Sequence, residues 1–529
     1  MNDKVKQSRL GPVAGVGRRI QVAGVVMGAL VVGLGIGFAK PAVSPAASAS
    51  SSAAQSTTTP VSSATLVCPM VKDTAATNIT TFTPVTVSGS GTASETVTQQ
   101  QSGSKTLLNA GKPGTLATAT GVSGGLVSAA NITDPSDPVI ARATGPDAAG
   151  FTMTETLPSG STDADKGLAS ENCGSPDTDF WFVGLGTDAN PFALLNLANV
   201  DDVAASVTVT MYTVNGQLAQ AQAQPLQGIT VSPNSEQSEL VNVLDSTGQG
   251  APYAIHVVAS AGRVAAAVLD WDEKGKGRDF IGSQKSASTL VFPGIPQAED
   301  NEKVQLSLLS PDASASVALR WVGQSTISPA VGSQFSGNLV QGKVTTVDLS
   351  SVPTTGEYAT LEVCGANSAS NNCLPVTGTN GAVAIVGGVK VTQSDKNGQD
   401  TAYTSPVLPL SGDGIVADNE AGSVVTLTNT GKTTAQVKLT ETGSGTNPVT
   451  GTATVSVPAG QTVATPLTPP KGAKNYALTV TPLGGAQNVY AARIEGTGST
   501  LSIQPLSTAA ETVTIPAVGQ DASGLVPQN

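Results

Sequence analysis

The chain has 529 residues, enough for roughly three to five domains of ordinary size. Only 3% of the residues are aromatic and 12% are charged, whereas glycine (58) and proline (33) are frequent, which favours short strands joined by turns over long helices. The net charge of −12 makes nucleic acid and anionic lipid surfaces unfavourable partners.

The first 38 residues have the pattern of a membrane anchor. Residues 1–19 are short and basic, and residues 20–38 contain no charged side chain. A helix of that length spans about 28 Å, close to the thickness of the hydrocarbon core. Because basic flanks stay in the cytoplasm, we predict a single-pass helix at 20–38 with the bulk of the chain outside the cell membrane. The alternative is a cleavable signal peptide and secretion.

The rest of the chain divides by composition. Residues 39–65 are rich in Ala, Ser, Thr and Pro and predict a stalk that cannot bury a core. Short apolar runs separated by turn residues then continue almost to the C-terminus. We predict four β modules and a flexible tail, at 66–170, 171–288, 289–410, 411–517 and 518–529.

A repeated pattern supports modules of similar construction. Tyr-Ala pairs begin strand-like runs at Tyr253, Tyr358 and Tyr476, spaced by the length of one sandwich domain. Within single runs, apolar and polar residues alternate, as in Val207–Thr208–Val209, which is typical of half-buried strands. The predicted fold class is all-β, with tandem β-sandwich modules and, by analogy, an immunoglobulin-like topology.

All four cysteines follow the apolar run, and export favours disulfides over free thiols. Cys364 and Cys373 close a short polar loop and form the first predicted pair. Cys68 and Cys173 form the second. No Cys-x-x-Cys spacing is present, so neither a zinc site nor a redox site is expected.

The carboxylates around Trp271 are the residues most similar to a catalytic set. Asp270 and Asp272 flank this tryptophan, and glycoside hydrolysis uses two carboxyl groups at a defined separation. However, residues that alternate along a strand end do not share the geometry of such a pair. A solvated loop is the preferred interpretation, with a ligand surface as the alternative.

Two further groups of residues are candidates for ligand binding. Phe180 and Trp181 belong to the densest aromatic cluster, which is either a core strand or a surface on which a sugar could stack. His256 is the only histidine, and because Ile255 and Val257 point to the other side of the strand, it is interpreted as structural. We expect no catalytic residues, no metal and no cofactor.

Residues 168–183 (LASENCGSPDTDFWFV) and 262–268 (GRVAAAV) resemble an uncharacterised actinobacterial family of membrane-anchored, exported proteins built of β-rich modules. The resemblance implies a place in the cell envelope, and it assigns no catalytic residues.

Anchor, stalk and repeats together predict a non-enzymatic envelope protein that acts as a scaffold or binding protein, with cell-wall glycan or envelope proteins as partners. The alternative is an accessory subunit of polysaccharide assembly that recognises glycan or a membrane glycosyltransferase. A carbohydrate hydrolase would rest on the carboxylates around Trp271 alone.

Overall fold

The structure is a computed structural model that describes residues 56–515, except 70–76, 85–93, 100–113, 121–125, 133–137, 187–190, 220–223, 242–250, 273, 299–301, 324–336, 351–355, 367–372, 379–380, 397, 445–448, 486–487 and 497–498. The predicted anchor at 20–38, most of the stalk and the C-terminal tail lie outside the described residues. Among those described there is no helix long and apolar enough to cross a membrane.

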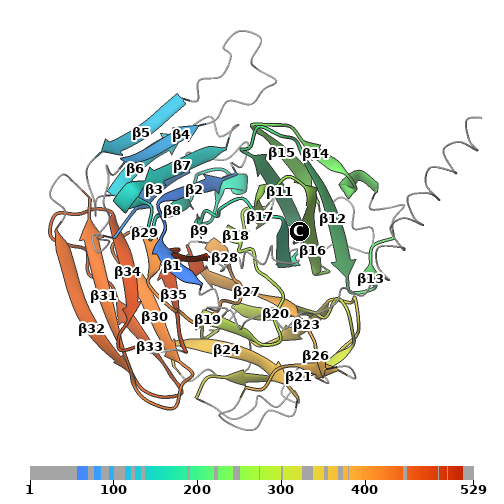
Figure 1. Ribbon diagram of the computed structural model, residues 1–529. Coiled ribbons are helices and arrows are strands. Elements are labelled where there is room, and N and C mark those ends of the chain that lie inside the picture. Colours follow the sequence, from blue (N-terminus) through green and yellow to red (C-terminus); the bar gives the residue numbers. More distant parts are fainter. Residues whose placement is uncertain are drawn as a thin grey trace, which may run out of the picture. The chain divides into compact units, whose positions relative to one another are not determined.

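The described chain is all-β, and its helices are three short 3-10 turns, η2 (Gly145–Asp147), η3 (Asp163–Asp165) and η4 (Gln224–Leu226). Residues 58–514 form one compact unit. In this unit, eight strands forming two four-stranded antiparallel sheets recur four times (Figure 1). We call these groups repeat 1 (63–172), repeat 2 (179–281), repeat 3 (290–404) and repeat 4 (414–505).

The strands of the first two repeats have the following bounds. Repeat 1 contains β2 (Ser63–Cys68), β3 (Thr77–Phe82), β4 (Ser94–Gln99), β5 (Gly114–Thr120), β6 (Leu126–Ile132), β7 (Val139–Thr144), β8 (Thr152–Leu157) and β9 (Ala169–Asn172). Repeat 2 contains β10 (Asp179–Leu185), β11 (Pro191–Asn199), β12 (Ala205–Thr213), β13 (Gly216–Gln217), β15 (Ser235–Leu240), β16 (Tyr253–Ala261), β17 (Ala265–Asp272) and β18 (Arg278–Ile281), with β14 (Ile229–Val231) added beside β12.

The other two repeats follow the same plan. Repeat 3 contains β19 (Leu290–Pro296), β20 (Lys303–Leu309), β21 (Ala315–Trp321), β22 (Asn338–Leu339), β23 (Thr345–Asp348), β24 (Tyr358–Gly365), β27 (Val386–Asp395) and β28 (Gly398–Thr404), with the small hairpin β25 (Thr377–Gly378) and β26 (Gly381–Ala382). Repeat 4 contains β29 (Gly414–Asn419), β30 (Val424–Asn429), β31 (Ala435–Gly443), β32 (Thr450–Val457), β33 (Gln461–Pro466), β34 (Tyr476–Pro482), β35 (Val489–Glu495) and β36 (Ser502–Pro505).

Strand order is the same in every repeat. Counting the eight main strands from the first, one sheet has the order 1-6-3-4 and the other 5-2-7-8, as in β29-β34-β31-β32 and β33-β30-β35-β36 of repeat 4. In an immunoglobulin constant domain the first two strands are neighbours in one sheet, whereas here they lie in different sheets. The immunoglobulin-like order expected from the sequence is therefore not the order of this fold.

Both sheets of a repeat contribute to one core. In repeat 4, Leu439 of β31 and Leu427 of β30 belong to the same buried cluster although they lie in different sheets. Alternation places the apolar side chains in such cores: along β12, buried residues alternate with partly exposed ones from Ala205 to Thr213. In β12 the binary pattern of the sequence thus determines which face of the strand is buried.

The three Tyr-Ala pairs begin the sixth strand of their repeats, at β16, β24 and β34. Tyr253 and Tyr476 are buried in the cores of their repeats, but in repeat 3 it is Ala359 that enters the core, and Tyr358 is only half-buried. A shift by one residue moves a side chain to the other face of a sheet. Tyr358 therefore lies on the face opposite to that of the other two tyrosines.

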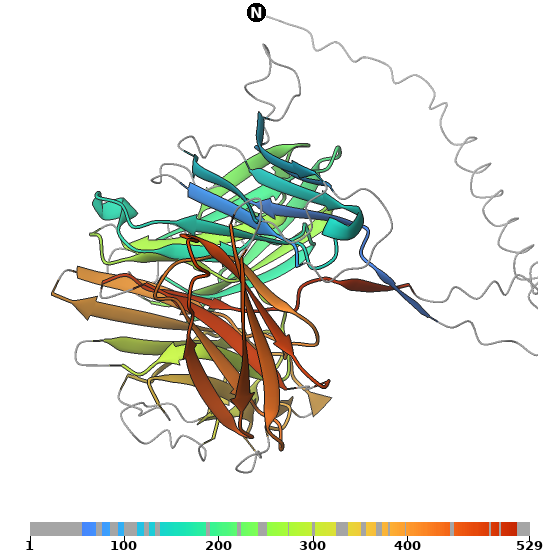
Figure 2. The same ribbon diagram turned by 90° about the vertical axis from the view of Figure 1, so that its left-hand side faces the viewer.

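The four repeats meet through their last strands. β9 contacts β18, β18 contacts β28, β28 contacts β36, and β36 contacts β9, so the cycle closes. Figure 1 shows β9, β18 and β28 in the middle of the ribbon, surrounded by the outer strands. At the ends of the unit, β1 (Thr57–Pro60) pairs with β37 (Thr512–Ile515), and the two strands are visible side by side in Figure 2.

Candidate functional site

Both predicted disulfides are present. Cys68 bonds Cys173 with their Cα atoms 5.0 Å apart, and Cys364 bonds Cys373 with a Cα separation of 5.2 Å. The first bond links β2, the first strand of repeat 1, to the residue that follows β9, its last strand. Two groups of acidic and cysteine side chains come close enough to hold a metal among the described residues, but both consist partly of these disulfide sulfurs.

The aromatic residues at the start of repeat 2 are buried. Phe180 and Trp181 lie on β10 with 8% and 5% of their surface exposed. The Trp181 ring stacks on the His256 ring with centroids 3.9 Å apart, and His256 Nε2 lies 3.0 Å from Oδ1 of Asp179. Ile255 belongs to the core on the opposite face, as the alternation predicted. These rings therefore join neighbouring strands and do not form a solvent-facing platform.

The carboxylates beside Trp271 are also buried, at 1% exposure each. Asp270 accepts a hydrogen bond of 2.5 Å from the Tyr403 hydroxyl of repeat 3, and Asp272 accepts one of 2.8 Å from the backbone N–H of Lys274. Trp271 stacks on Phe192 of the neighbouring strand, with ring centroids 5.1 Å apart. The structure places this group and the Trp181 group in different sheets of repeat 2 and does not bring them together into one site.

A carboxylate that the sequence analysis did not single out lies where the four repeats meet. Asp400 of β28 accepts hydrogen bonds from the backbone N–H groups of Leu168, Arg278 and Leu501, at 2.9, 3.3 and 2.8 Å. These donors belong to repeats 1, 2 and 4, and a fourth bond of 2.8 Å comes from Thr401 in its own repeat. One buried side chain is thus bonded to all four repeats.

A second carboxylate has the same kind of environment. Asp279 of β18 accepts hydrogen bonds from the backbone N–H of Ser170, at 3.3 Å, and of Tyr403, at 3.1 Å. The Ser502 hydroxyl lies 3.4 Å away, and Phe280 N–H of its own repeat donates at 2.9 Å. Repeats 1, 3 and 4 are again represented. We call Asp279 and Asp400 the axial carboxylates.

Glycines allow the close approach of the backbone to Asp400. At Gly167, where φ is 104°, an added Cβ would lie 2.4 Å from Asp400 Oδ1. At Gly277, where φ is 110°, it would lie 2.5 Å from the same atom. Each of these glycines immediately precedes a donor, Leu168 or Arg278. A side chain at either position would push the donor away from the carboxylate.

Burial has a strong effect on the acidic groups near the centre. It raises the pKa of Asp400 to about 7, and the four backbone N–H donors oppose that rise. Burial likewise raises the pKa of Asp279 well above its usual range. Burial raises the pKa of Glu155, on β8, to about 8, and neither of its carboxyl oxygens has a hydrogen-bond partner among the residues that the structure describes. Glu155 is therefore held as the neutral acid at pH 7.

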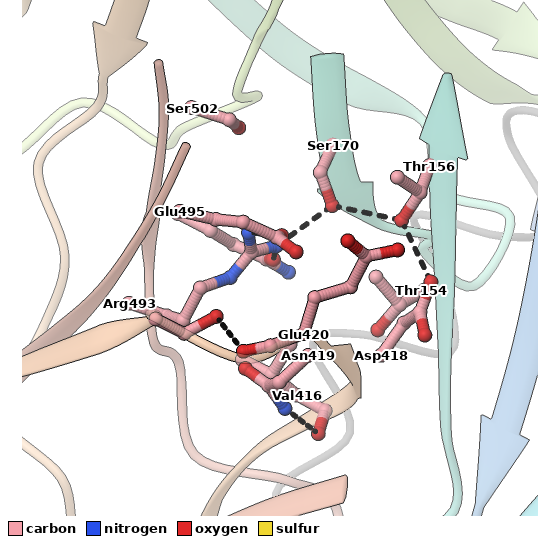
Figure 3. A network of polar contacts seen from close by, with 12 residues as sticks. Thr154, Thr156, Ser170, Val416, Asp418, Asn419, Glu420, Arg493, Glu495 and Ser502 are labelled. Carbon is pink, nitrogen blue, oxygen red and sulfur yellow. Dashed lines mark hydrogen bonds and ion pairs between the residues drawn. The ribbon is translucent and has the colours of Figure 1, made fainter. Parts of the chain in front are cut away.

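Repeats 1 and 4 are joined by a second polar network (Figure 3). The buried Arg493 guanidinium donates to the Ser170 hydroxyl, at 2.7 Å, and to Gln504 Oε1, at 2.5 Å, and forms an ion pair with Glu495. The Thr156 hydroxyl donates to Asp418 across the same boundary, at 3.1 Å. A buried cation with these partners fixes the relative position of the two repeats, because leaving it unpaired would be costly.

A cleft lies between repeats 3 and 4. Its volume is about 750 Å³, and an adjoining cavity of about 390 Å³ shares the side chains of Arg320, Glu362 and Lys432. We call the two together the 3/4 cleft. The larger cavity is also lined by Tyr358 and Gln461, and the smaller one by Tyr490. Volumes of this size are usual for small-molecule sites, which often lie between domains.

The polar groups of the 3/4 cleft are positioned by neighbouring strands. Arg320 of β21 is directly opposite Glu362 of β24, and the two side chains form a largely buried ion pair. Burial and the nearby Glu362 raise the pKa of Tyr490 to about 12, so its hydroxyl keeps its proton at neutral pH. A buried ion pair and a neutral hydroxyl offer both hydrogen-bond donors and acceptors to a ligand.

Hydroxyl groups close the boundary between the two repeats beneath the 3/4 cleft. Thr360 of β24 lies 2.5 Å from the Thr428 hydroxyl of β30, and Thr428 lies 2.9 Å from that of Thr462 on β33. These contacts hold β24 against the second sheet of repeat 4. The cleft therefore has walls from two repeats whose spacing is set by direct hydrogen bonds.

The arrangement of the 3/4 cleft is suited to binding. Among the described lining residues Glu362 is the single carboxylate, and it forms an ion pair with Arg320. Glycoside hydrolysis by the usual routes needs two carboxyl groups on opposite sides of the scissile bond. The described lining of the cleft thus offers hydrogen-bond donors and acceptors for recognising a ligand.

Fold and site together define an all-β protein of four repeated pairs of sheets, closed around buried carboxylates and carrying two disulfides. The chain belongs to a family of unknown function, DUF5719, whose model matches residues 127–468. The match runs from β6 of repeat 1 to just beyond β33 of repeat 4 and includes both axial carboxylates. No curated protein and no solved structure matches the chain.

The sequence did contain a signal for the axial carboxylates. Gly277-Arg278-Asp279 and Gly398-Gln399-Asp400 both place an acidic residue two positions after a glycine at the start of a strand. Because the two triplets lie at corresponding ends of their repeats, the repeat alignment could have identified them. No comparable pattern marks Arg320 and Glu362, which are brought opposite each other by strand pairing alone.

Proposed function

We propose that the protein is a non-enzymatic scaffold or binding protein of the actinobacterial cell envelope, anchored by residues 20–38 and exposed outside the membrane. The observation that carries this proposal is the set of hydrogen bonds from all four repeats to Asp400. A carboxylate shared in this way holds the repeats as a rigid body, and rigid elements keep binding clefts in a fixed shape.

Two further features support the extracytoplasmic location. All four cysteines are in disulfides, a state that persists in oxidising compartments. The basic residues before the apolar run favour a cytoplasmic N-terminus. Each pair of sheets with its common core is regarded in this proposal as one β-sandwich module, so that the anchor carries four sandwiches.

The second candidate function is an accessory subunit of envelope polysaccharide assembly. The 3/4 cleft favours it, because a cleft with an ion pair and two tyrosines can recognise a glycan without cleaving it. In this role the protein would present the glycan to a membrane glycosyltransferase.

Crosslinking in living cells tests the proposal. A photo-crosslinker placed at an exposed position such as Leu408 is expected to capture envelope glycan or envelope proteins. The same residue labelled from outside the cell with a membrane-impermeant reagent, as Leu408→Cys, is expected to react without lysis. Labelling that requires lysis, or purified protein that turns over a wall glycan, would contradict the proposal.

A further inference from the structure

The geometry of the 3/4 cleft points to a binding site for an anionic saccharide, a sugar chain that carries carboxylate or phosphate groups. This inference rests on the proposed function and adds to it a site and a class of ligand. The cleft is large enough to hold a saccharide of several sugar rings, and it is formed by two repeats.

Two tyrosines line the 3/4 cleft. The whole chain has six, yet Tyr358 and Tyr490 both line the 3/4 cleft. Tyr358 is there because its strand is shifted by one residue relative to the corresponding strands, whose tyrosines are buried in cores. A sugar ring presents C–H groups that pack on an aromatic face, and hydroxyls that a phenol can hydrogen-bond.

The charges of the cleft are the second observation. Arg320 and Lys432 contribute two positive charges and Glu362 one negative charge, in a chain whose net charge is −12. Arg320 and Glu362 neutralise each other in their ion pair. Lys432 is exposed and has no ion-pair partner among the described residues. An anionic group on the ligand would supply that partner.

The backbone beside Lys432 is the third observation. Asn488, which lines the smaller cavity, has a φ of 102°, a conformation that is unusual for a residue other than glycine. Its carbonyl accepts a hydrogen bond of 3.0 Å from the Thr430 N–H, so it fixes the loop that carries Lys432. Such conformations persist where surrounding structure holds them, often at ligand sites.

Titration calorimetry of the purified full-length chain tests the inference with a matched pair of probes. One probe is a hexuronic acid tetramer, and the other is the same tetramer with its carboxyl groups reduced to alcohols. We expect the acidic probe to bind at least about fivefold more tightly, because the ion pair to Lys432 is charge-assisted. A phosphorylated tetramer of the reduced sugar shows which anionic group is preferred; tight binding of either charged probe supports the inference.

Two variants locate the site. Lys432→Gln is expected to remove the preference for the charged probe while leaving the thermal unfolding temperature unchanged. Lys438→Gln changes an exposed lysine on β31 that lines neither cavity and serves as the matched control, with no change expected. Tyr358→Ala is expected to lower the affinity for both probes about tenfold, because the contact between the probe and a half-buried aromatic ring is lost.

Equal binding of all probes, or equal effects of Lys432→Gln and Lys438→Gln, would overturn the inference. These failures are distinguishable from failure of the proposed function. If the chain crosslinks to envelope components in cells but Lys432→Gln does not change probe binding, the scaffold function stands and the saccharide site is ruled out. A chain that captures nothing in cells loses the proposed function as well.

Discussion

At the level of single residues, the most consequential groups are carboxyls inside the protein. Asp400 is buried and yet accepts four backbone hydrogen bonds, whereas Glu155 is buried and neither of its oxygens has a partner in the described part of the chain. The hydrogen bonds to Asp400 partly offset the rise in its pKa that burial causes, whereas burial is the one cause of the raised pKa of Glu155. The two residues should therefore respond in different ways to replacement by an amide.

Replacing Asp400 by asparagine should destabilise the fold. The amide keeps the size of the side chain but presents an NH₂ group to backbone N–H donors, which are then left without an acceptor, so a loss of about 3 kcal/mol in the free energy of unfolding is expected. Urea unfolding measures it. Asp312→Asn, at an exposed position, is the control and should change stability by less than about 0.5 kcal/mol. Equal stability of the two variants would contradict the role given to Asp400.

Replacing Glu155 by glutamine should alter the dependence of stability on pH. The pKa of Glu155 is raised to about 8 in the folded state, so between its unfolded value and pH 8 the folded chain binds one proton more. Stability from this group is full at low pH and falls by about 1.4 kcal/mol per unit as pH rises through that range.

Urea unfolding at pH 5 and pH 8 checks this dependence. In Glu155→Gln, the slope of the free energy of unfolding against pH should lose the contribution of one bound proton. The variant should also be more stable than the parent chain at pH 8. Asp400 contributes in the same direction up to about pH 7, where its own pKa lies, so a slope remains in the variant. An unchanged slope would show that Glu155 is ionised in the folded state.

At the level of the strand, the sequence predicted the positions of strands better than it predicted the residues of the candidate sites. Alternation of apolar and polar residues identified β12 correctly, because that strand buries one face. The Tyr-Ala pairs identified three corresponding strands, but they misaligned the middle one by one residue. Only the pairing partners fix that register, and they are distant in sequence.

The shift of register makes a prediction for the tyrosines. Tyr253→Ala and Tyr476→Ala should each lower the free energy of unfolding by about 3–5 kcal/mol, since a core side chain is removed. Tyr358→Ala should cost much less, because its side chain faces the 3/4 cleft and is half-buried. Urea unfolding of the three variants compares them. A loss at Tyr358 as large as at Tyr253 would place Tyr358 in the core.

The disulfides also act at this level. Cys68 and Cys173 are separated by 105 residues, and Cys364 and Cys373 by 9. Because the entropy of the unfolded chain is reduced more by a longer loop, loss of the first bond should cost about 4–5 kcal/mol and loss of the second about 2–3 kcal/mol. Paired Cys→Ala variants measured by urea unfolding should show this order. The reverse order would indicate that the short loop depends on its disulfide for more than entropy.

At the level of the whole molecule, composition and repeats predicted an all-β chain of several similar units but not how the units meet. Closure of β9, β18, β28 and β36 depends on residues that are far apart in sequence, such as Leu168 and Asp400. The Gly-x-Asp triplets mark Asp279 and Asp400 when the repeats are compared, but they do not show which distant backbone groups these side chains bind. The 3/4 cleft has no such signal, because its ion pair and tyrosines come from separate strands of two repeats.

The central claim is that the axial carboxylates unite four repeats into one cooperative unit, and differential scanning calorimetry of the full-length chain tests it most directly. The parent chain should unfold in a single transition, because no repeat can leave the centre without breaking hydrogen bonds to Asp279 and Asp400. The double variant Asp279→Asn/Asp400→Asn should unfold in separated transitions at lower temperature. Separate transitions already present in the parent chain, and unchanged in the double variant, would contradict the claim.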